Sequence, residues 1–107
     1  KIEKATLPLY FSNDQSVAWL DADKVCFPLK IRKWQQGDVF QPLGMEGKRQ
    51  KVSDFFIRQK LSIFEKEAAW IMESNGQIVW IIGYRISEKF KISNETKNCL
   101  FVKWANG

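Results

Sequence analysis

Short apolar runs, each bounded by residues that favour turns, recur along the whole chain. In the last of them, over 96–104, Leu100, Val102 and Trp104 fall on one side of an extended backbone. Four further runs have the character of strands, two of them interrupted by proline, and lie at 2–11, 17–20, 25–33 and 39–40. The periodicity therefore predicts a domain built mainly from short β-strands.

The clearest local signal is a β-hairpin over 70–82. Asn75-Gly76 supplies the two positive φ angles that a type I′ turn requires, and extended apolar segments flank it. A two-residue turn at this point places Met72 opposite Val79. Residues 78–82 are apolar on both faces, so this strand is expected to be central in a sandwich or barrel.

A single short helix is expected over 53–61. Ser53 can accept a backbone N–H of the first turn, and Asp54 adds favourable negative charge at the same end. Ile57, Leu61 and Phe64 are spaced as one helical face. With six or seven strands, these elements predict a mainly β, α+β fold: a small sandwich or barrel-like domain that spans 1–107 as a single unit.

Composition removes several classes of function. The chain has no histidine, which is the commonest general base and a frequent zinc ligand, and its two cysteines lack a Cys-x-x-Cys spacing. We therefore expect no metal site, whereas composition leaves catalysis by Asp, Glu or Lys open. Cys26 and Cys99 each lie in an apolar run, which favours two buried free thiols in a reducing cytoplasm, although the sequence also permits a disulfide. No run has the character of a signal peptide or a membrane span.

The formal net charge is +5, and it is unevenly distributed. Residues 30–66 contain nine basic and four acidic residues, whereas the segments on either side are close to neutral. Such a local excess indicates either a positive face that attracts polyanions or a solvated surface without a partner. Charge alone does not choose between these two interpretations.

The basic excess is centred on a glycine-containing loop that precedes the expected helix. Gly44 and Gly47 are separated by two residues instead of four, and Arg49 stands where Ser or Thr would bind magnesium, so an ATP-binding P-loop is rejected. The G-x-x-G loop of KH domains joins two helices, which this segment does not. What remains is a cationic arm beside a helix N-terminus, and both features favour phosphate.

Residues 31–61 carry a more specific pattern, IRKWQQGDVFQPLGMEGKRQKVSDFFIRQKL. In order it contains Arg32, Trp34, Gly37-Asp38, Phe40, Pro42, Gly44-Met45, Gly47 and Ser53-Asp54-Phe55-Phe56. This pattern resembles the signature of the C-terminal domain of tRNA(Ile)-lysidine synthases, and the similarity continues through 78–92 and Thr96. Gln50 departs from it, because it interrupts a cluster that is often basic throughout in that family.

The resemblance implies a fold like the small β-sandwich domain of bacterial phenylalanyl-tRNA synthetase β chains. It also implies that 1–107 is a fragment of a longer cytoplasmic enzyme, with 1–16 as a lead-in strand. Enzymes of this family use ATP to join lysine to the wobble cytidine of tRNA(Ile), and this chemistry, with its ATP and magnesium, resides in an N-terminal catalytic domain. The C-terminal domain is implied to be non-catalytic, to hold no cofactor, and to help recognise the tRNA towards its acceptor stem.

The resulting hypothesis is a tRNA-binding surface of basic side chains around the loop and the helix start. Its members are Arg32, Lys33, Lys48, Arg49, Lys51, Arg58 and Lys60, with Trp34 as a candidate for stacking on a base. The expected partners are tRNA(Ile) and the enzyme's own N-terminal domain. The alternative is a structural domain that packs on the catalytic domain with little RNA contact, and its mark would be an exposed apolar patch.

Overall fold

The computed structural model describes residues 2–5 and 16–104, which form nine strands, two α-helices and two 3-10 helices. The strands are β1 (Ile2–Ala5), β2 (Val17–Asp21), β3 (Leu29–Lys33), β4 (Val39–Phe40), β5 (Gln50–Lys51), β6 (Trp70–Ser74), β7 (Gln77–Ile81), β8 (Arg85–Ile86) and β9 (Cys99–Lys103). The helices are α1 (Val52–Arg58), α2 (Ile63–Ala68), η1 (Ala22–Lys24) and η2 (Glu88–Phe90). The predicted mainly β, α+β class is confirmed. The strands β5 and β8 were not expected, and each of them is only two residues long.

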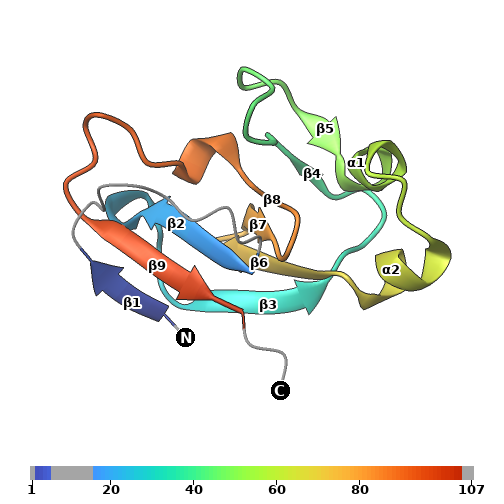
Figure 1. The fold of residues 1–107 in the computed structure, drawn as a ribbon, viewed down its shortest axis with the longest axis horizontal. Helices are drawn as coiled ribbons and strands as arrows, with labels where there is room; N and C mark the ends of the chain where they lie inside the picture. The colour runs from blue at the N-terminus through green and yellow to red at the C-terminus, as the bar shows by residue number, and fades with distance from the viewer. Residues whose placement is uncertain (1, 6–15, 105–107) are drawn as a thin grey trace.

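The elements form three layers (Figure 1). The sheet β1-β9-β2 is one outer layer, the sheet β3-β6-β7-β8 is the middle layer, and the β4-β5 pair with α1 covers its other face. Trp80 of the middle sheet packs in one buried cluster with Leu100 of β9, whereas Ile81 packs in a second cluster with Phe55 and Phe56 of α1. The middle sheet is thus buried on both faces, as the apolar run 78–82 predicted.

The β6–β7 hairpin has the predicted turn but a different register. Asn75 and Gly76 adopt φ angles of 51° and 79°, as a type I′ turn requires. The pairing is regular next to the turn and then shifts, so that Met72 pairs with Trp80. The expected pairing of Met72 with Val79 is therefore wrong, because Val79 is the extra residue of a β-bulge. The bulge allows Val79 and Trp80 to enter the same core, which strict alternation would forbid.

Helix α1 begins one residue before the predicted start. Its N-cap is Lys51, which makes no side-chain cap hydrogen bond, and Ser53 lies inside the first turn. The expectation that Ser53 caps the helix is therefore wrong. Asp54 lies in the first turn as expected, where its negative charge interacts favourably with the positive end of the helix dipole.

A Schellman motif ends α1 at Arg58. Lys60 has a φ of 58°, and its N–H donates to the Ile57 carbonyl at 3.0 Å, while the Leu61 N–H donates to the Phe56 carbonyl at 3.1 Å. The predicted apolar face is therefore wrong, because the helix does not continue to Leu61. Val52, Phe55 and Phe56 form its buried face instead.

Replacing Lys60 with glycine is expected to stabilise the domain by about 0.5–1 kcal/mol, because a side chain disfavours the left-handed backbone at this position. Urea unfolding measures the change as a higher midpoint with an unchanged slope. The matched control is Gln59→Gly. Because Gln59 has helical φ and ψ angles, glycine at this position should lower the stability of the domain. A Lys60→Gly variant less stable than the parent would contradict the expectation.

A second helix, α2, was missed in the sequence analysis. Ser62 caps it: its Oγ accepts from the Glu65 N–H at 3.1 Å, and Glu65 Oε1 accepts from the Ser62 N–H at 2.9 Å. This reciprocal pair is a capping box, whose Ser-x-x-Glu spacing is visible in the sequence. None of the residues of α2 is buried.

The two cysteines are free, but only one of them is buried. The expectation of a buried thiol holds for Cys99 and is wrong for Cys26, which is exposed. Burial, and then the nearby Asp21 carboxylate, raises the pKa of the Cys99 thiol. Most of the expected first strand lies in 6–15, outside the described residues, whereas β1 pairs with β9 along its whole length. Among the described residues, no helix is long and apolar enough to span a membrane.

Candidate nucleic-acid interface

The loop 41–49 connects β4 to β5 and extends from one edge of the molecule (Figure 1). Its first end is fixed, because Pro42 is fully buried and forms an isolated β-bridge with Ser87. The Leu43 N–H also donates to the Ile86 carbonyl at 3.1 Å. At its other end the chain re-enters the β4-β5 pair and continues directly into α1. Both ends of the loop are therefore held by the fold.

Two consecutive tight turns form the tip of this loop. The Met45 N–H donates to the Pro42 carbonyl at 3.2 Å, and the Lys48 N–H donates to the Met45 carbonyl at 3.0 Å. Gly44 and Gly47, at the third position of each turn, have φ angles of 93° and 80°, which glycine adopts without strain. The two glycines therefore shape the turns that present the following cationic residues.

Lys48, Arg49 and Lys51 are exposed at this loop. Within the described part of the chain, no carboxylate forms an ion pair with any of these three side chains. Arg49 also lines a polar groove of about 290 Å³, together with Gln77 of β7 and Lys89 of η2. Lys89 is thus a candidate that the sequence analysis missed, since nothing in its local sequence indicates that η2 faces the loop.

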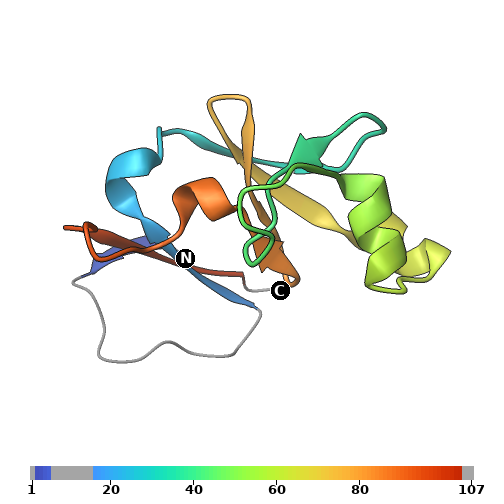
Figure 2. The same cartoon turned by 90° about the horizontal axis from the view of Figure 1, so that it is seen from above.

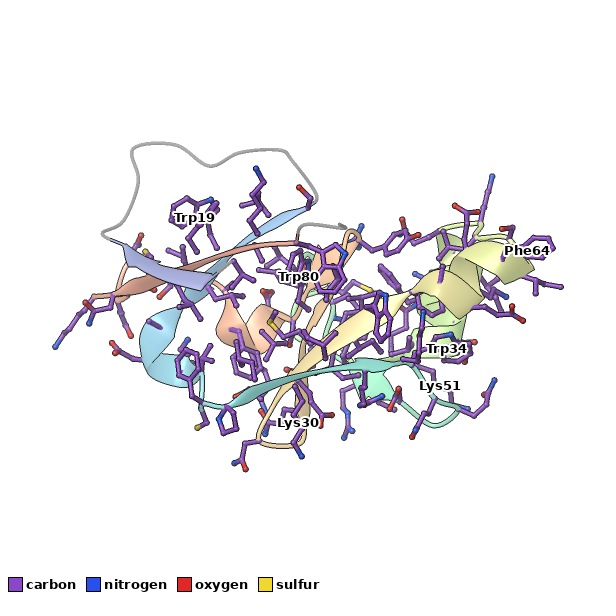
Figure 3. All side chains as sticks on the ribbon, turned by 90° about the horizontal axis from the view of Figure 1, so that it is seen from below. Trp19, Lys30, Trp34, Lys51, Phe64 and Trp80 are labelled. Atoms are coloured by element: carbon purple, nitrogen blue, oxygen red, sulfur yellow. The ribbon has the colours of Figure 1, made fainter. Side chains whose placement is uncertain are left out.

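A second groove, of about 240 Å³, lies on the other side of the β6–β7 turn. It is lined by Phe27, Lys30 and Asn75 among others, and it shares Gly76 with the first groove. This turn extends from the body of the molecule (Figure 2), and Lys30 lies beside it (Figure 3). Positive side chains therefore flank the turn on both sides, with Lys30 as a second candidate that the sequence analysis missed.

Arg32 is placed differently from the loop residues, because two carboxylates hold it. Its guanidinium forms a bidentate pair with Asp38 at 2.9 and 3.0 Å, and its Nε donates to Glu73 at 2.9 Å. Hydrogen bonding to Asp38 in particular, and then to Glu73, raises the pKa of the Arg32 guanidinium despite the opposing effect of burial. Asp38 also accepts the Gln35 N–H at 2.7 Å, and its carbonyl accepts the Val52 N–H. Arg32 therefore connects β3 and β6 to the start of α1.

Lys33 and Trp34 also make contacts within the domain. The Lys33 Nζ lies 3.9 Å from the centre of the Trp70 ring, in a cation–π contact. Trp34 is half-buried, its Nε1–H donates to the Lys66 carbonyl at 2.9 Å, and its ring packs edge-on to Phe56 at 5.3 Å. These contacts give Trp34 a role in packing α1 and α2, and its stacking on a base stays a prediction.

Arg58 and Lys60 lie at the far end of α1, roughly 10 Å from Lys51 along the helix axis at 1.5 Å per residue. Both side chains are exposed. Of the seven predicted residues, the fold thus groups Lys48, Arg49 and Lys51, whereas Arg58 and Lys60 lie apart from them at the other end of α1. No group of three or more Cys, Asp or Glu residues in the described ranges has the geometry of a metal site.

The matches to known proteins cover most of the chain. The family model described as the TilS substrate C-terminal domain matches residues 29–104. The tRNA(Ile)-lysidine synthase of Parabacteroides distasonis is 41% identical over 92% of this chain and 22% of its own length. That of Bacteroides thetaiotaomicron is 40% identical over 84% of this chain and 21% of its own length. The chain therefore spans about a fifth of the length of these relatives.

Two solved structures share the fold. A crystal structure of a TilS C-terminal domain superposes with a TM-score of 0.77 at 22% identity, covering 99% of this chain and 83% of that one. An N-terminal fragment of the phenylalanyl-tRNA synthetase β-subunit from Pyrococcus horikoshii gives a TM-score of 0.67 at 17% identity, covering 79% of this chain and 26% of that one. The chain therefore shares its fold with this β-subunit fragment, whereas the expectation named bacterial β chains. From the family model and the synthase relatives together, we conclude that this chain belongs to the family of C-terminal domains of tRNA(Ile)-lysidine synthases.

Proposed function

We propose that this chain is the non-catalytic tRNA-recognition domain of a tRNA(Ile)-lysidine synthase. The observation that supports this role best is the set of exposed cations around the anchored loop, namely Lys48, Arg49 and Lys51, with which no carboxylate of residues 2–5 and 16–104 forms an ion pair. Lys89 and Lys30 extend this positive surface along the two grooves beside the β6–β7 turn. Arg32 is omitted from the surface because two carboxylates already neutralise it.

The proposed mode of recognition is contact with the sugar–phosphate backbone. Side chains cannot read the bases in the narrow major groove of A-form RNA, so helical RNA is recognised mostly through its shape, phosphates and 2′-hydroxyls. Arg49 can bind a phosphate with two parallel N–H donors, whereas the lysines act as point charges. The rigid base of the loop keeps these charges at fixed separations, and this would favour one register on the RNA.

In the complete synthase, the domain would hold the tRNA from the acceptor-stem side while lysine is attached to the wobble cytidine elsewhere. That reaction would use ATP and magnesium bound by the N-terminal catalytic domain, and the whole would work in the cytoplasm. The residues described here would supply binding energy and orientation only. Correct positioning lowers the entropic cost of a reaction at a distant site.

The triple variant Lys48→Ala/Arg49→Ala/Lys51→Ala tests the proposal. It should bind tRNA(Ile) at least about tenfold more weakly at low salt, and its slope of log K against log salt should fall by about two to three, because three phosphate contacts are lost. Filter binding of the 107-residue chain over a salt series measures both quantities.

The matched control is Lys24→Ala/Lys66→Ala/Lys97→Ala, which removes the same charge from η1, α2 and the segment before β9. It should retain most of the affinity and the salt slope. An equal loss of tRNA affinity in the two variants would mean that net charge alone, and not the position of the loop cations, determines binding. Unchanged binding by the loop variant would refute the proposed contact surface.

A further inference from the structure

The helical end of the molecule exposes an apolar patch that no described element covers. Ile57, Ile63 and Phe64 are exposed to 62%, 70% and 82%, and α2 buries none of its residues. Figure 3 shows Phe64 at the outer edge of this end, whereas Trp80 lies in the interior. Scattered apolar residues are normal on a surface, but these three large side chains all fall within residues 57–64, at the end of α1 and the start of α2.

The charges around this patch distinguish it from the loop. Glu65 and Glu67 of α2 lie beside Lys66, and Arg58 and Lys60 precede them, so both signs are present. An RNA backbone would meet acidic side chains and apolar groups that offer it no hydrogen bond. An apolar centre with a mixed charged rim is the usual composition of a protein–protein interface.

The length of the relatives indicates what could cover the patch. In the matched tRNA(Ile)-lysidine synthases about four-fifths of the polypeptide lies outside the region that corresponds to this chain. A partner on the same polypeptide is present at high effective concentration, so a small patch is sufficient for it to dock. A separate partner would need a larger interface than these three side chains provide.

We propose that the patch formed by Ile57, Ile63 and Phe64 is the surface on which the remaining part of the synthase chain packs. This rests on the proposed function, in that the domain works inside a tRNA(Ile)-lysidine synthase. The rim would pair Glu65, Glu67 and Lys60 with complementary charges around an apolar contact. Docking of the patch on the rest of the synthase would also orient the cationic loop, because α1 lies directly between the loop and the patch in the chain.

Hydrogen exchange of the α2 amides tests this docking. We expect the amides of 64–68 to exchange at least about tenfold more slowly in the complete synthase than in the 107-residue chain, because the helix is covered only in the former. In the synthase carrying Ile63→Ser/Phe64→Ser, these amides should return to the rates of the short chain. The matched control is Phe27→Ser, which removes another exposed aromatic, 58% exposed, from outside the patch and should leave the protection intact.

Equal α2 exchange in the complete synthase and the short chain would overturn the proposal. Protection that appears in the short chain and rises with its concentration would assign the patch to a second copy instead, and would also overturn it. The tRNA affinity of the short chain separates this proposal from the proposed function. It should be unchanged by Ile63→Ser/Phe64→Ser and reduced by the loop variant, so either result can fail without the other.

Discussion

Replacing Phe56 with alanine is expected to lower the free energy of unfolding by about 3–5 kcal/mol, because it opens a cavity in the core beneath α1. Phe56 is fully buried, and its ring contacts those of Trp34, Phe55 and Tyr84 at centroid distances of 5.3 to 6.3 Å. It also accepts the Leu61 N–H through its carbonyl, which keeps it at the closed end of the helix. Urea unfolding followed by tryptophan fluorescence measures the loss.

The adjacent residue provides the control for this prediction. Ile57→Ala removes a side chain of similar apolar character that is 62% exposed, and it should change the stability of the 107-residue chain by less than about 0.5 kcal/mol. Similar losses for the two variants would mean that α1 does not pack as described. Ile57 also belongs to the proposed docking patch, so in the complete synthase the same variant tests the proposed docking.

Replacing Arg32 with alanine is expected to cost about 2–3 kcal/mol, since it leaves two partly buried carboxylates without their common partner. The side chains of Asp38 and Glu73 are only 14% and 15% exposed, whereas that of Arg32 is 28% exposed. This exposure places the cost below that of a fully buried pair. Thermal or urea unfolding of the variant gives the value.

Arg32→Lys separates charge from geometry. Lysine keeps the positive charge but cannot donate to both carboxylates in the fork arrangement, so an intermediate loss is expected. The variants also test the original assignment of Arg32 as an RNA contact. If Arg32 is structural, folded Arg32→Ala should show the salt slope of the parent in tRNA binding, and a slope lower by about one would indicate a phosphate contact.

The sequence was sufficient for those features that depend on local pattern. The Asn75-Gly76 turn, the doubly buried strand that follows it and the one-sided burial of Leu100 and Val102 all followed from spacing. The end of α1 did not follow, because Lys60 adopts a left-handed backbone that its residue type does not indicate. The bulge at Val79 could not be predicted from local sequence either, because it depends on how the side chains of β7 pack into the two cores on either face of the sheet.

The candidate site likewise contains residues that local sequence indicates and residues that only the folded structure brings together. Lys48, Arg49 and Lys51 could be predicted as candidates because they are neighbours in sequence and follow a glycine-containing loop. Arg32 could not be separated from them, since its carboxylate partners lie six and 41 residues away. Lys30 and Lys89 were missed for the complementary reason, that only the folded chain places them beside the same hairpin turn.

The construction of the loop has a consequence for how such domains diverge. A methyl group added at Gly44 or Gly47 would meet no atom within 4 Å, so the tip lies free of both cores. Exchanges of Gly44 and Gly47 themselves would be strained, because both have positive φ angles. Insertions beside them should be tolerated, since lengthening an exposed loop costs little closure entropy. Selection can therefore change the length of the tip, and with it the proposed RNA contact, while the layers beneath it stay as they are.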